Sequence, residues 1–299
     1  MKRAVSVSIG TSKRDKAVEI DLLGQRVRLE RIGTDGDMKK AARLFTELDG
    51  NVDALGVGGA DLGLQVDDRW YPLYSVLPMV RQVRRTPITD GAGLKNTLEA
   101  GLAQFLDERL DEPIVPRRVL ITSGADRWGM TRSFVEAGYE CLFGDLMFGL
   151  GLPIPIRSPQ GLKRLAALLM PIAGRLPFSW IYPIGEKQEE RSPRWGKAYA
   201  WAPVIAGDNH YIKRFMPDRL EGKTIVTNTT TVEDVDLFRR AGVRRLLTST
   251  PVFDGRSFGT NVMEAGLIAA SGKGRRLSHD ELRSMIAELG LRPSLQELA

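Results

Sequence analysis

A strand, a turn, a helix and a second strand follow one another between residues 118 and 145, and this unit constrains the fold more than any other feature of the sequence. Residues 118–123 are an apolar run, residues 128–138 carry apolar side chains at helical spacing, and residues 139–145 form a second largely apolar run. When a helix connects two strands in this way, the strands lie parallel in one sheet and the helix packs against that sheet. The unit therefore predicts an α/β fold, and the strands and helices that alternate after it, as far as residue 250, predict a doubly wound parallel sheet.

The turn of this unit can be compared with the dinucleotide-binding fingerprint G-x-G-x-x-G. Gly124 and Gly129 occupy its first and third positions, and Asp126 occupies the second. In the fingerprint the first glycine permits a sharp turn, the second lets the backbone approach a diphosphate, and the third lets helix and strand pack closely. Because an aspartate adds bulk and negative charge, the turn is either a dinucleotide cradle or a plain corner.

Further residues favour the dinucleotide. The guanidinium of Arg127 or Arg132 can offset the charge of Asp126, and the helix start offers free N–H donors. Asp145 follows the second strand about 20 residues after the first glycine, where an acid binds a ribose 2′-hydroxyl. Asn228 and Thr229 follow another strand and are expected at the same sheet edge. We therefore predict a cofactor site for NAD, with NADP less favoured, that includes Asp126 and Arg127.

Strands and helices alternate along the rest of the chain as well. A hairpin is expected around Gly24, a helix within residues 37–50 and a long amphipathic helix over residues 92–110, before Pro113 and Pro116 break the pattern. This organisation predicts an N-terminal α/β substrate domain at 1–115, a Rossmann-like dinucleotide-binding domain at 116–275 and C-terminal helices at 276–299.

Two short sequences of the form S/T-x-x-E predict helix starts late in the chain. They are Thr230 with Glu233 and Ser278 with Glu281. In such a capping box each side chain binds a backbone amide that the first helical turn leaves without a partner.

A group of polar residues in the segment 86–99 predicts a catalytic cleft. A short strand ends at Asp90, two glycines follow, and Lys95, Asn96 and Thr97 begin a helix. A lysine beside a carboxylate can exchange a proton with a substrate hydroxyl while hydride leaves the same carbon. We therefore predict Lys95 and Asp90 as catalytic residues and Asn96 and Thr97 as substrate ligands. In the alternative interpretation, Asp90 caps the helix and the lysine is exposed.

A third group follows the strand predicted near residue 248. Arg256 and Ser257 lie between Gly255 and Gly259 past its carboxyl end, where open α/β sheets bind ligands, and Asn261 follows two residues later. All three are predicted to bind the substrate. Arg256 would hold a carboxylate through two parallel hydrogen bonds. Asp208 and His210 form a further candidate acid–base pair.

Composition limits the classes of partner. The net charge of +6 comes from short basic clusters without a nucleic-acid recognition pattern, so we expect a small-molecule substrate and no nucleic acid. Cys141 is the one cysteine and only two histidines are present, so neither a disulfide nor a metal site is expected. No apolar run predicts a secretory signal or a membrane span, and we expect a cytoplasmic protein. The aromatic segment 176–203 is either a lid or a homo-oligomer interface.

The segments IGTDGDMKKAARLFTELDG, VDALGVGGADL, TPITDGAGLKNTLE and GRSFGTNVMEA resemble bacterial proteins of the quinate 5-dehydrogenase or amino-acid dehydrogenase type. The resemblance extends over nearly the whole chain. It implies a Rossmann domain behind a substrate domain and NAD(P)-linked oxidation of a hydroxyl group.

Together these features predict an NAD-dependent oxidoreductase that acts on a small polar hydroxy acid. Two alternatives remain open. One is a non-catalytic regulatory protein that binds a nucleotide or metabolite, and the other is a non-redox enzyme that uses the same cleft.

Overall fold

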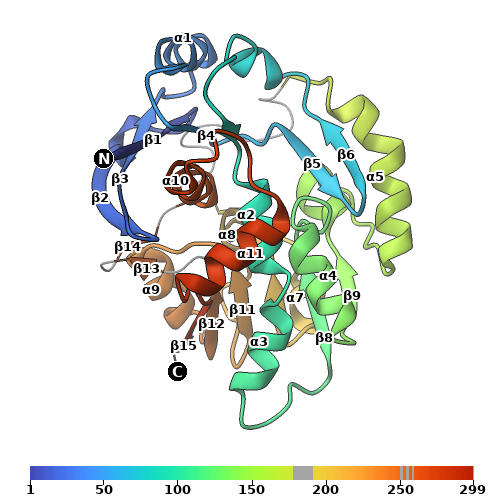
Figure 1. Cartoon of the computed structure of the whole chain (residues 1–299). Helices are drawn as coiled ribbons and strands as arrows, with labels where there is room; N and C mark the ends of the chain where they lie inside the picture. Colours follow the sequence, from blue (N-terminus) through green and yellow to red (C-terminus); the bar gives the residue numbers. More distant parts are fainter. Residues whose placement is uncertain (178–190, 250–251, 254–255, 258, 299) are drawn as a thin grey trace.

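Two separate sheets organise the chain in the computed structural model, in the upper and lower parts of Figure 1. The structure describes residues 1–177, 191–249, 252–253, 256–257 and 259–298, and for 252–253 and 256–257 it describes the backbone alone. Helices pack against both sheets. This mixed arrangement confirms the predicted α/β fold class.

The first sheet comes from the N-terminal part of the chain and has the order β2-β3-β1-β4-β7. Four strands run parallel, and β2 pairs with β3 in the antiparallel hairpin predicted around Gly24. A separate hairpin, β5 and β6, follows β4. The strand bounds are β1 (Lys2–Ser8), β2 (Lys16–Leu22), β3 (Gln25–Gly33), β4 (Ala54–Gly58), β5 (Gly63–Val66), β6 (Arg69–Pro72) and β7 (Ile88–Thr89).

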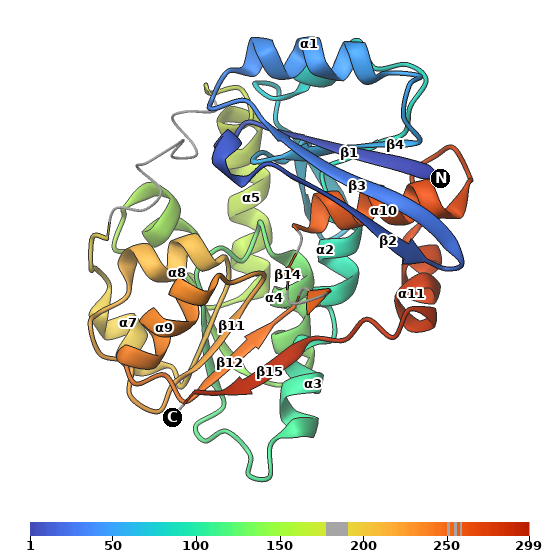
Figure 2. The same cartoon turned by 90° about the vertical axis from the view of Figure 1, so that its left-hand side faces the viewer.

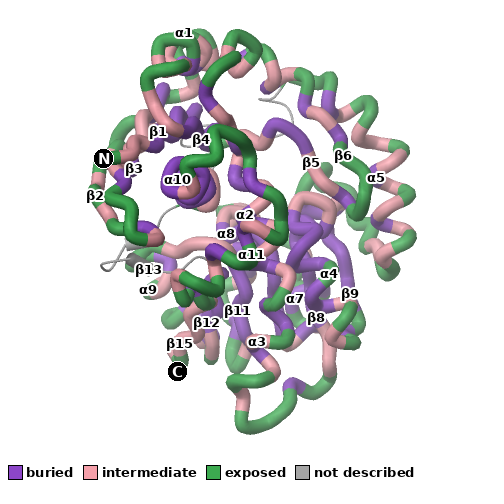
Figure 3. Tube along the Cα trace, viewed as in Figure 1, coloured by how far each residue is buried: buried purple, intermediate pink, exposed green. Residues whose placement is uncertain are grey.

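Helices cover both faces of the first sheet, and one of them comes from the other end of the chain. α1 (Met38–Leu48) lies on one face and α10 (Thr260–Ser271) on the other (Figure 2). Residues 262–270 of α10 are all buried (Figure 3), as expected of a helix that is apolar all round. α2 (Ala92–Glu99) and α11 (His279–Glu288) join the same apolar cluster. Short 3-10 helices are η1 (Ser12–Arg14) and η2 (Leu77–Val80).

The second sheet has the order β9-β8-β10-β11-β12-β15. Its first five strands are parallel, and β15 is antiparallel at the edge. From β8 the chain adds β9 on one side and then β10, β11 and β12 on the other. The sheet is therefore doubly wound, with its switch point between β8 and β10. The bounds are β8 (Arg118–Ile121), β9 (Glu140–Phe143), β10 (Val204–Ala206), β11 (Thr224–Thr227), β12 (Arg245–Thr248) and β15 (Ser294–Glu297).

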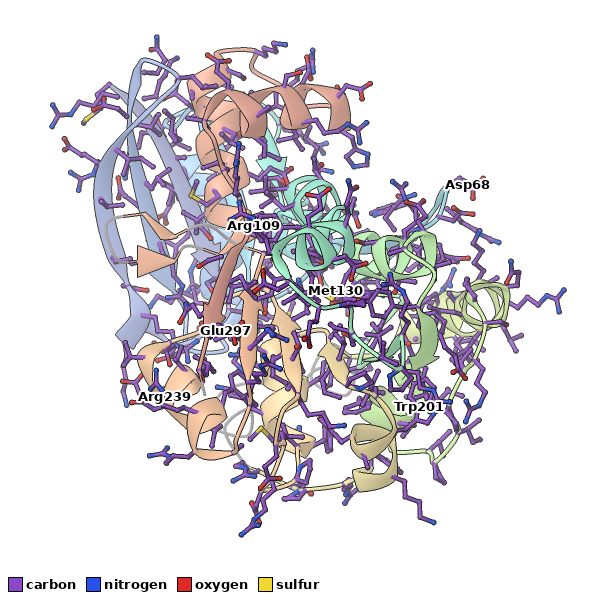
Figure 4. All side chains as sticks on the ribbon, turned by 90° about the horizontal axis from the view of Figure 1, so that it is seen from below. Asp68, Arg109, Met130, Trp201, Arg239 and Glu297 are labelled. Atoms are coloured by element: carbon purple, nitrogen blue, oxygen red, sulfur yellow. The ribbon has the colours of Figure 1, made fainter. Side chains whose placement is uncertain are left out.

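Alternate residues of the second sheet face different helix layers. On β8, Val119 and Ile121 belong to the apolar cluster with α3, α4 and α5, whereas Leu120 belongs to the cluster with α7, α8 and α9. Met130 of α4 lies deep inside, in the middle of the view in Figure 4. The helix bounds are α3 (Leu102–Arg109), α4 (Trp128–Glu136), α5 (Pro159–Ala173), α7 (Gly196–Trp201), α8 (Asn209–Phe215) and α9 (Val232–Arg240). No helix of the described part of the chain could cross a membrane.

Three short elements complete the second part of the chain. A π-helical turn, η3 (Asp145–Gly149), follows β9, and a small hairpin is formed by β13 (Val252–Phe253) and β14 (Arg256–Ser257). η3 begins at Asp145, so this residue lies just after the end of β9, the second strand of the strand–helix–strand unit 118–145.

Two predictions of helix extent are wrong. The long helix expected over residues 92–110 is two helices, because α2 ends at Glu99 and α3 begins at Leu102, with Gly101 as its N-cap. The segment after residue 276 holds one helix, α11, followed by the strand β15 rather than a further helix. β15 completes the edge of the second sheet, a role that depends on a distant partner strand. The domain boundaries at residues 115 and 275 stay predictions.

One capping box is confirmed and the other is displaced. Ser278 and Glu281 bind each other's backbone amides at the start of α11, as predicted. At the start of α9 the pair is Thr231 with Asp234. The prediction of Thr230 with Glu233 is therefore wrong by one residue.

Replacing Gly266 of α10 by Leu should destabilise the protein by about 1–3 kcal/mol, the usual cost of overpacking a core. A Cβ atom at Gly266 would lie 2.8 Å from Cδ2 of Leu29, which is buried in the first sheet. Urea unfolding measures the loss. Gly196→Leu is the control, because a Cβ there meets nothing within 4 Å. Equal losses for both variants would contradict the close packing of α10 on the sheet.

Candidate functional site

Seven charged side chains lie where the carboxyl ends of strands from both sheets come together. Asp61 follows β4 of the first sheet, and Asp126 and Arg127 follow β8 of the second. Lys95 and Glu99 extend from α2, Asp145 follows β9, and Asp208 follows β10. Because ligands of open α/β sheets bind beyond the carboxyl ends of strands, this place is the candidate site. The junction cluster is the set Asp61, Lys95, Glu99, Asp126, Arg127, Asp145 and Asp208.

Lys95 connects the two sheets within the junction cluster. Its Nζ lies 2.9 Å from Oδ1 of Asp126 and 3.5 Å from Oδ1 of Asp61, and its side chain is 9% exposed. Burial alone would lower the pKa of Lys95, but the carboxylates of Asp126 and Asp61 outweigh it and raise that pKa. Lys95 is therefore a fixed cation at neutral pH.

Arg127 spans the switch point of the second sheet. Its NH1 donates to Oε1 of Glu99 at 2.5 Å, and its NH2 donates to Oδ2 of Asp208 at 2.6 Å. Burial raises the pKa of Glu99, and Arg127 offsets part of that rise. For Asp208, burial alone would raise the pKa, but the charge of Arg127, together with His210 and the hydrogen bond from its amide, lowers it. Arg127 thus ties α2, the turn after β8 and the end of β10 together.

Asp126 and Asp145 occupy the corner predicted to bind a dinucleotide. The carboxylate of Asp126 binds Lys95, and burial is outweighed by Lys95 and Arg127, so its pKa is lowered. The carboxylate of Asp145 faces the corner and accepts hydrogen bonds from the amides of Gly124 at 3.0 Å and Ala125 at 2.8 Å. Burial raises the pKa of Asp145 to about 6.

Asp61 is a carboxyl group of the junction cluster whose pKa lies near neutrality. Burial, together with the nearby carboxylates of Asp126 and Asp90, raises its pKa to about 7 against the opposing charge of Lys95. Its side chain is 32% exposed, so solvent and ligands can reach it. A group that is half protonated at neutral pH is suited to proton transfer.

The stability of the protein should fall as the pH rises from about 4 to 7 on account of Asp61. Because folding raises its pKa from 3.8 to about 7, the folded state binds more protons than the unfolded state in this window. The contribution is complete below the unfolded pKa and is lost as the pH approaches the folded one. Asp61→Asn cannot titrate and should lack this dependence. Urea unfolding across the window tests it, and parallel profiles for both proteins would contradict it.

Packing accounts for both glycines of the corner. A Cβ at Gly124 would lie 2.8 Å from Cδ2 of Leu162 in α5, and one at Gly129 would lie 2.8 Å from the backbone oxygen of Asn96 in α2. The amide of Gly129 donates to Oδ1 of Asn96 at 3.2 Å. The amides of Gly124 and Gly129 are thus both engaged by side chains, and a diphosphate would need other donors.

The structure does not pair Asp90 with Lys95. Asp90 accepts hydrogen bonds from the amides of Leu62 at 2.7 Å and Ala92 at 3.1 Å, at the start of α2. Thr97 donates to the backbone oxygen of Gly93 within the same helix. Asp90 and Thr97, which were predicted to line a cleft, therefore stabilise the start of α2. The carboxylates beside Lys95 are those of Asp61 and Asp126.

The remaining predicted ligands are dispersed. Asn228 lies at the second sheet's edge, where its Nδ2 is 3.2 Å from Oδ2 of Asp208, and Thr229 is half-buried beside it. Asn261 begins α10 and donates to Oγ of Ser6 in the first sheet at 2.6 Å. The side chains of Arg256 and Ser257 lie outside the described residues.

Several members of the site were missed by sequence reasoning. Asp61 follows a buried strand and two glycines, a position that could have identified it. Glu99 has no such signal, because it is one of three acids in the run 92–110 that was predicted to form a single amphipathic helix. Asp208 was predicted as a partner of the His210 side chain, but its carboxylate accepts one hydrogen bond from the backbone amide of His210 and another from the guanidinium of Arg127. Tyr211 was also missed. Burial and the nearby charges of Asp126, Asp208 and Asp145 raise the pKa of its hydroxyl group.

Family models match the chain in two parts. Residues 93–298 match a domain of unknown function (DUF8754), and residues 3–90 match a domain of unknown function (DUF8753). No curated protein matches the chain significantly. These findings give no support to the resemblance to quinate 5-dehydrogenases.

Solved structures resemble the chain at low identity. An NAD-dependent malic enzyme from Thermotoga maritima is 11% identical over 95% of this chain and 84% of that one, with a TM-score of 0.37. A malic enzyme from Entamoeba histolytica is 12% identical over 97% and 70%, with a TM-score of 0.36. GanP, a glucose-galactose binding protein from Geobacillus stearothermophilus, is 11% identical over 99% and 97%, with a TM-score of 0.38. At these values the likenesses carry no argument about function.

Proposed function

The chain belongs to the family described as a domain of unknown function (DUF8754), and we propose that it is an oxidoreductase acting on a hydroxyl group of a small polar substrate at the junction cluster. A hydroxy acid is the substrate class that the sequence favours. The observation that carries the proposal is the position of Lys95 between Asp126 and Asp61, where the carboxyl ends of strands from two sheets meet.

The roles of the three residues follow from their pKa directions. Lys95 stays protonated, so it donates a hydrogen bond to the substrate oxygen and stabilises negative charge that develops there. Asp61, with a pKa of about 7, accepts the hydroxyl proton in oxidation and returns it in reduction. Asp126 holds the ammonium of Lys95 in place. This assignment replaces the predicted partner Asp90 by Asp61.

NAD is the cofactor that the sequence implies, and when bound it would supply the acceptor for hydride. The amides of Gly124, Ala125 and Gly129 are engaged by side chains, so the diphosphate would need other donors, but two observations support a fit of the ribose and of the charge. Asp145 faces the corner and keeps further oxygen lone pairs with which to accept from ribose hydroxyls. The charge of Asp126, which would oppose a phosphate, is paired with Lys95 and Arg127. Because the Asp145 carboxylate would repel a 2′-phosphate, NAD is favoured over NADP.

Replacing Lys95 by Met should reduce turnover by about 10²–10⁴-fold, the usual contribution of a positioned proton-transfer group. Reduction of NAD, followed by absorbance with a panel of hydroxy acids and amino alcohols, measures the loss. Thermal stabilisation by NAD should persist in the variant. Lys163→Met is the control, because Lys163 pairs with Asp67 at the surface of α5.

Two results would contradict this assignment. Unchanged turnover in Lys95→Met would remove the role of Lys95. Binding of NAD without reduction by any compound of the panel would instead favour a non-catalytic protein that senses the nucleotide.

A further inference from the structure

The junction cluster holds more carboxylates than cations. Its cations are Lys95 and Arg127, and its acids are Asp61, Glu99, Asp126, Asp145 and Asp208. Arg127 is bound by Glu99 and Asp208, and the nearer partner of Lys95 is Asp126. Asp61 and Asp145 are therefore left without a cation of their own within the cluster.

The surroundings of these two carboxyl groups show the imbalance directly. Asp145 is held by the amides of Gly124 and Ala125, and its charged neighbour is the like charge of Asp126. Asp61 shares Lys95 with Asp126 and faces Asp90 as well, with Arg127 as the more distant cation. Both groups thus lie in an environment that opposes their ionisation, and a positive charge brought to the cluster would relieve it.

Buried polar atoms without partners provide independent evidence for a ligand. In the described part of the chain, the buried atoms without a hydrogen-bond partner include two acceptors, Oε2 of Glu99 and Oγ of Ser123, in residues that are 0% and 7% exposed. They also include one donor of the cluster, Nε of Arg127, which lies 3.5 Å from Oδ2 of Asp126. Glu99 belongs to the cluster, and Ser123 immediately precedes the corner at Gly124. Leaving such atoms unsatisfied costs about 1–3 kcal/mol each, and both can accept a hydrogen bond from a ligand's N–H.

We propose that the substrate of the junction cluster carries an ammonium group beside its hydroxyl, as an amino alcohol or a hydroxy amino acid does. An ammonium offers three donors and one positive charge to a cluster rich in acceptors. A substrate that is a dicarboxylate would instead bring further negative charge to Asp61, which already shares Lys95 with Asp126. A metal ion is the less fitting cation, since no three His, Cys, Asp or Glu side chains of the described residues converge as ligands. The part of this inference that concerns the hydroxyl group rests on the proposed function, whereas the part that concerns the ammonium group is independent of it.

Thermal melting with matched pairs of ligands tests the inference. The pairs are ethanolamine with ethylene glycol, serine with glycerate, and glucosamine with glucose, and magnesium chloride is the inorganic cation. At least one amine should raise the melting temperature clearly more than its hydroxyl partner and more than magnesium. A panel in which no amine exceeds its partner, or in which magnesium matches the best amine, overturns the inference.

The variant Asp61→Asn adds a second readout. It should weaken binding of the best amine on the order of tenfold, as expected for the loss of one charge-assisted hydrogen bond. In the wild type, amine binding should release protons near pH 7, because an added cation lowers the pKa of Asp61 from about 7. Calorimetry in two buffers of different ionisation enthalpy measures the release.

The control for this variant is Asp280→Asn, whose side chain is 87% exposed on α11 and pairs with Arg283. Equal amine affinity in Asp61→Asn and wild type, or binding without proton release, overturns the inference. Turnover with NAD is measured separately. If the enzyme transfers hydride only from uncharged alcohols, the inference that the substrate carries an ammonium group is wrong, and the proposed oxidoreductase function still holds.

Discussion

Replacing Arg127 by Met is expected to lower the free energy of unfolding by about 3–5 kcal/mol, the cost of leaving buried charges without their partner. Arg127 is 5% exposed, and its guanidinium neutralises Glu99 and Asp208, which are 0% and 7% exposed. Methionine fills a similar volume but has no positive charge with which to neutralise the two carboxylates. The carboxylates of Glu99 and Asp208 must then either become protonated or be hydrated by entering water. Both changes weaken the contact between α2 and the second sheet.

Urea unfolding followed by tryptophan fluorescence measures this loss. Arg132→Met is the matched control on the same helix, because Arg132 pairs with Glu136 at side-chain exposures of 53% and 62%. Exposed pairs of this kind contribute only about 0–1 kcal/mol. A loss for Arg127→Met no larger than that of the control would show that the buried network does not hold the two parts of the chain together.

A fragment of residues 1–90, the part matched by DUF8753, is expected to remain unfolded by itself. The face of the first sheet formed by Leu22, Val27 and Leu29 packs against α10, which the fragment lacks. Exposing these buried side chains removes about 1.5–3 kcal/mol each, and a small domain has little stability to lose. Thermal melting followed by circular dichroism should show no cooperative transition.

A fusion of the fragment to residues 259–290 through a flexible linker is the control. It restores α10 and α11 and should recover a cooperative transition. Cooperative melting of the fragment without this addition would show that α10 is dispensable, and the first sheet would then be an independent domain.

Local sequence signals predicted much of the fold. The hairpin around Gly24, α1, α4 and the five parallel strands of the second sheet all have apolar periodicity or turn residues that specify them within a few positions, whereas β15 does not. α10 has no such periodicity, because it is apolar on every side. Its placement against the first sheet depends on contacts across most of the chain, such as Asn261 with Ser6.

The candidate site was predicted in part. Lys95, Asp126, Arg127 and Asp145 were assigned to a site, and the structure brings them together. The partners of Lys95 were not predictable, since Asp90 is nearer in sequence, whereas Asp126 and Asp61 are its partners in space. Buried ion pairs such as Arg127 with Asp208 join residues 81 positions apart, and a single sequence does not distinguish such charges from exposed ones.

The most direct test of the central claim, that the corner beside the junction cluster binds a dinucleotide for hydride transfer, is thermal melting with NAD and NADP. NAD at about 100 times its Kd should stabilise the wild type by about 2.7 kcal/mol, and NADP should stabilise it less. Asp145→Ala should lose most of the shift relative to its own baseline, because Asp145 is the residue proposed to bind the ribose. No shift with either nucleotide, or the same shift in Asp145→Ala, would contradict the claim.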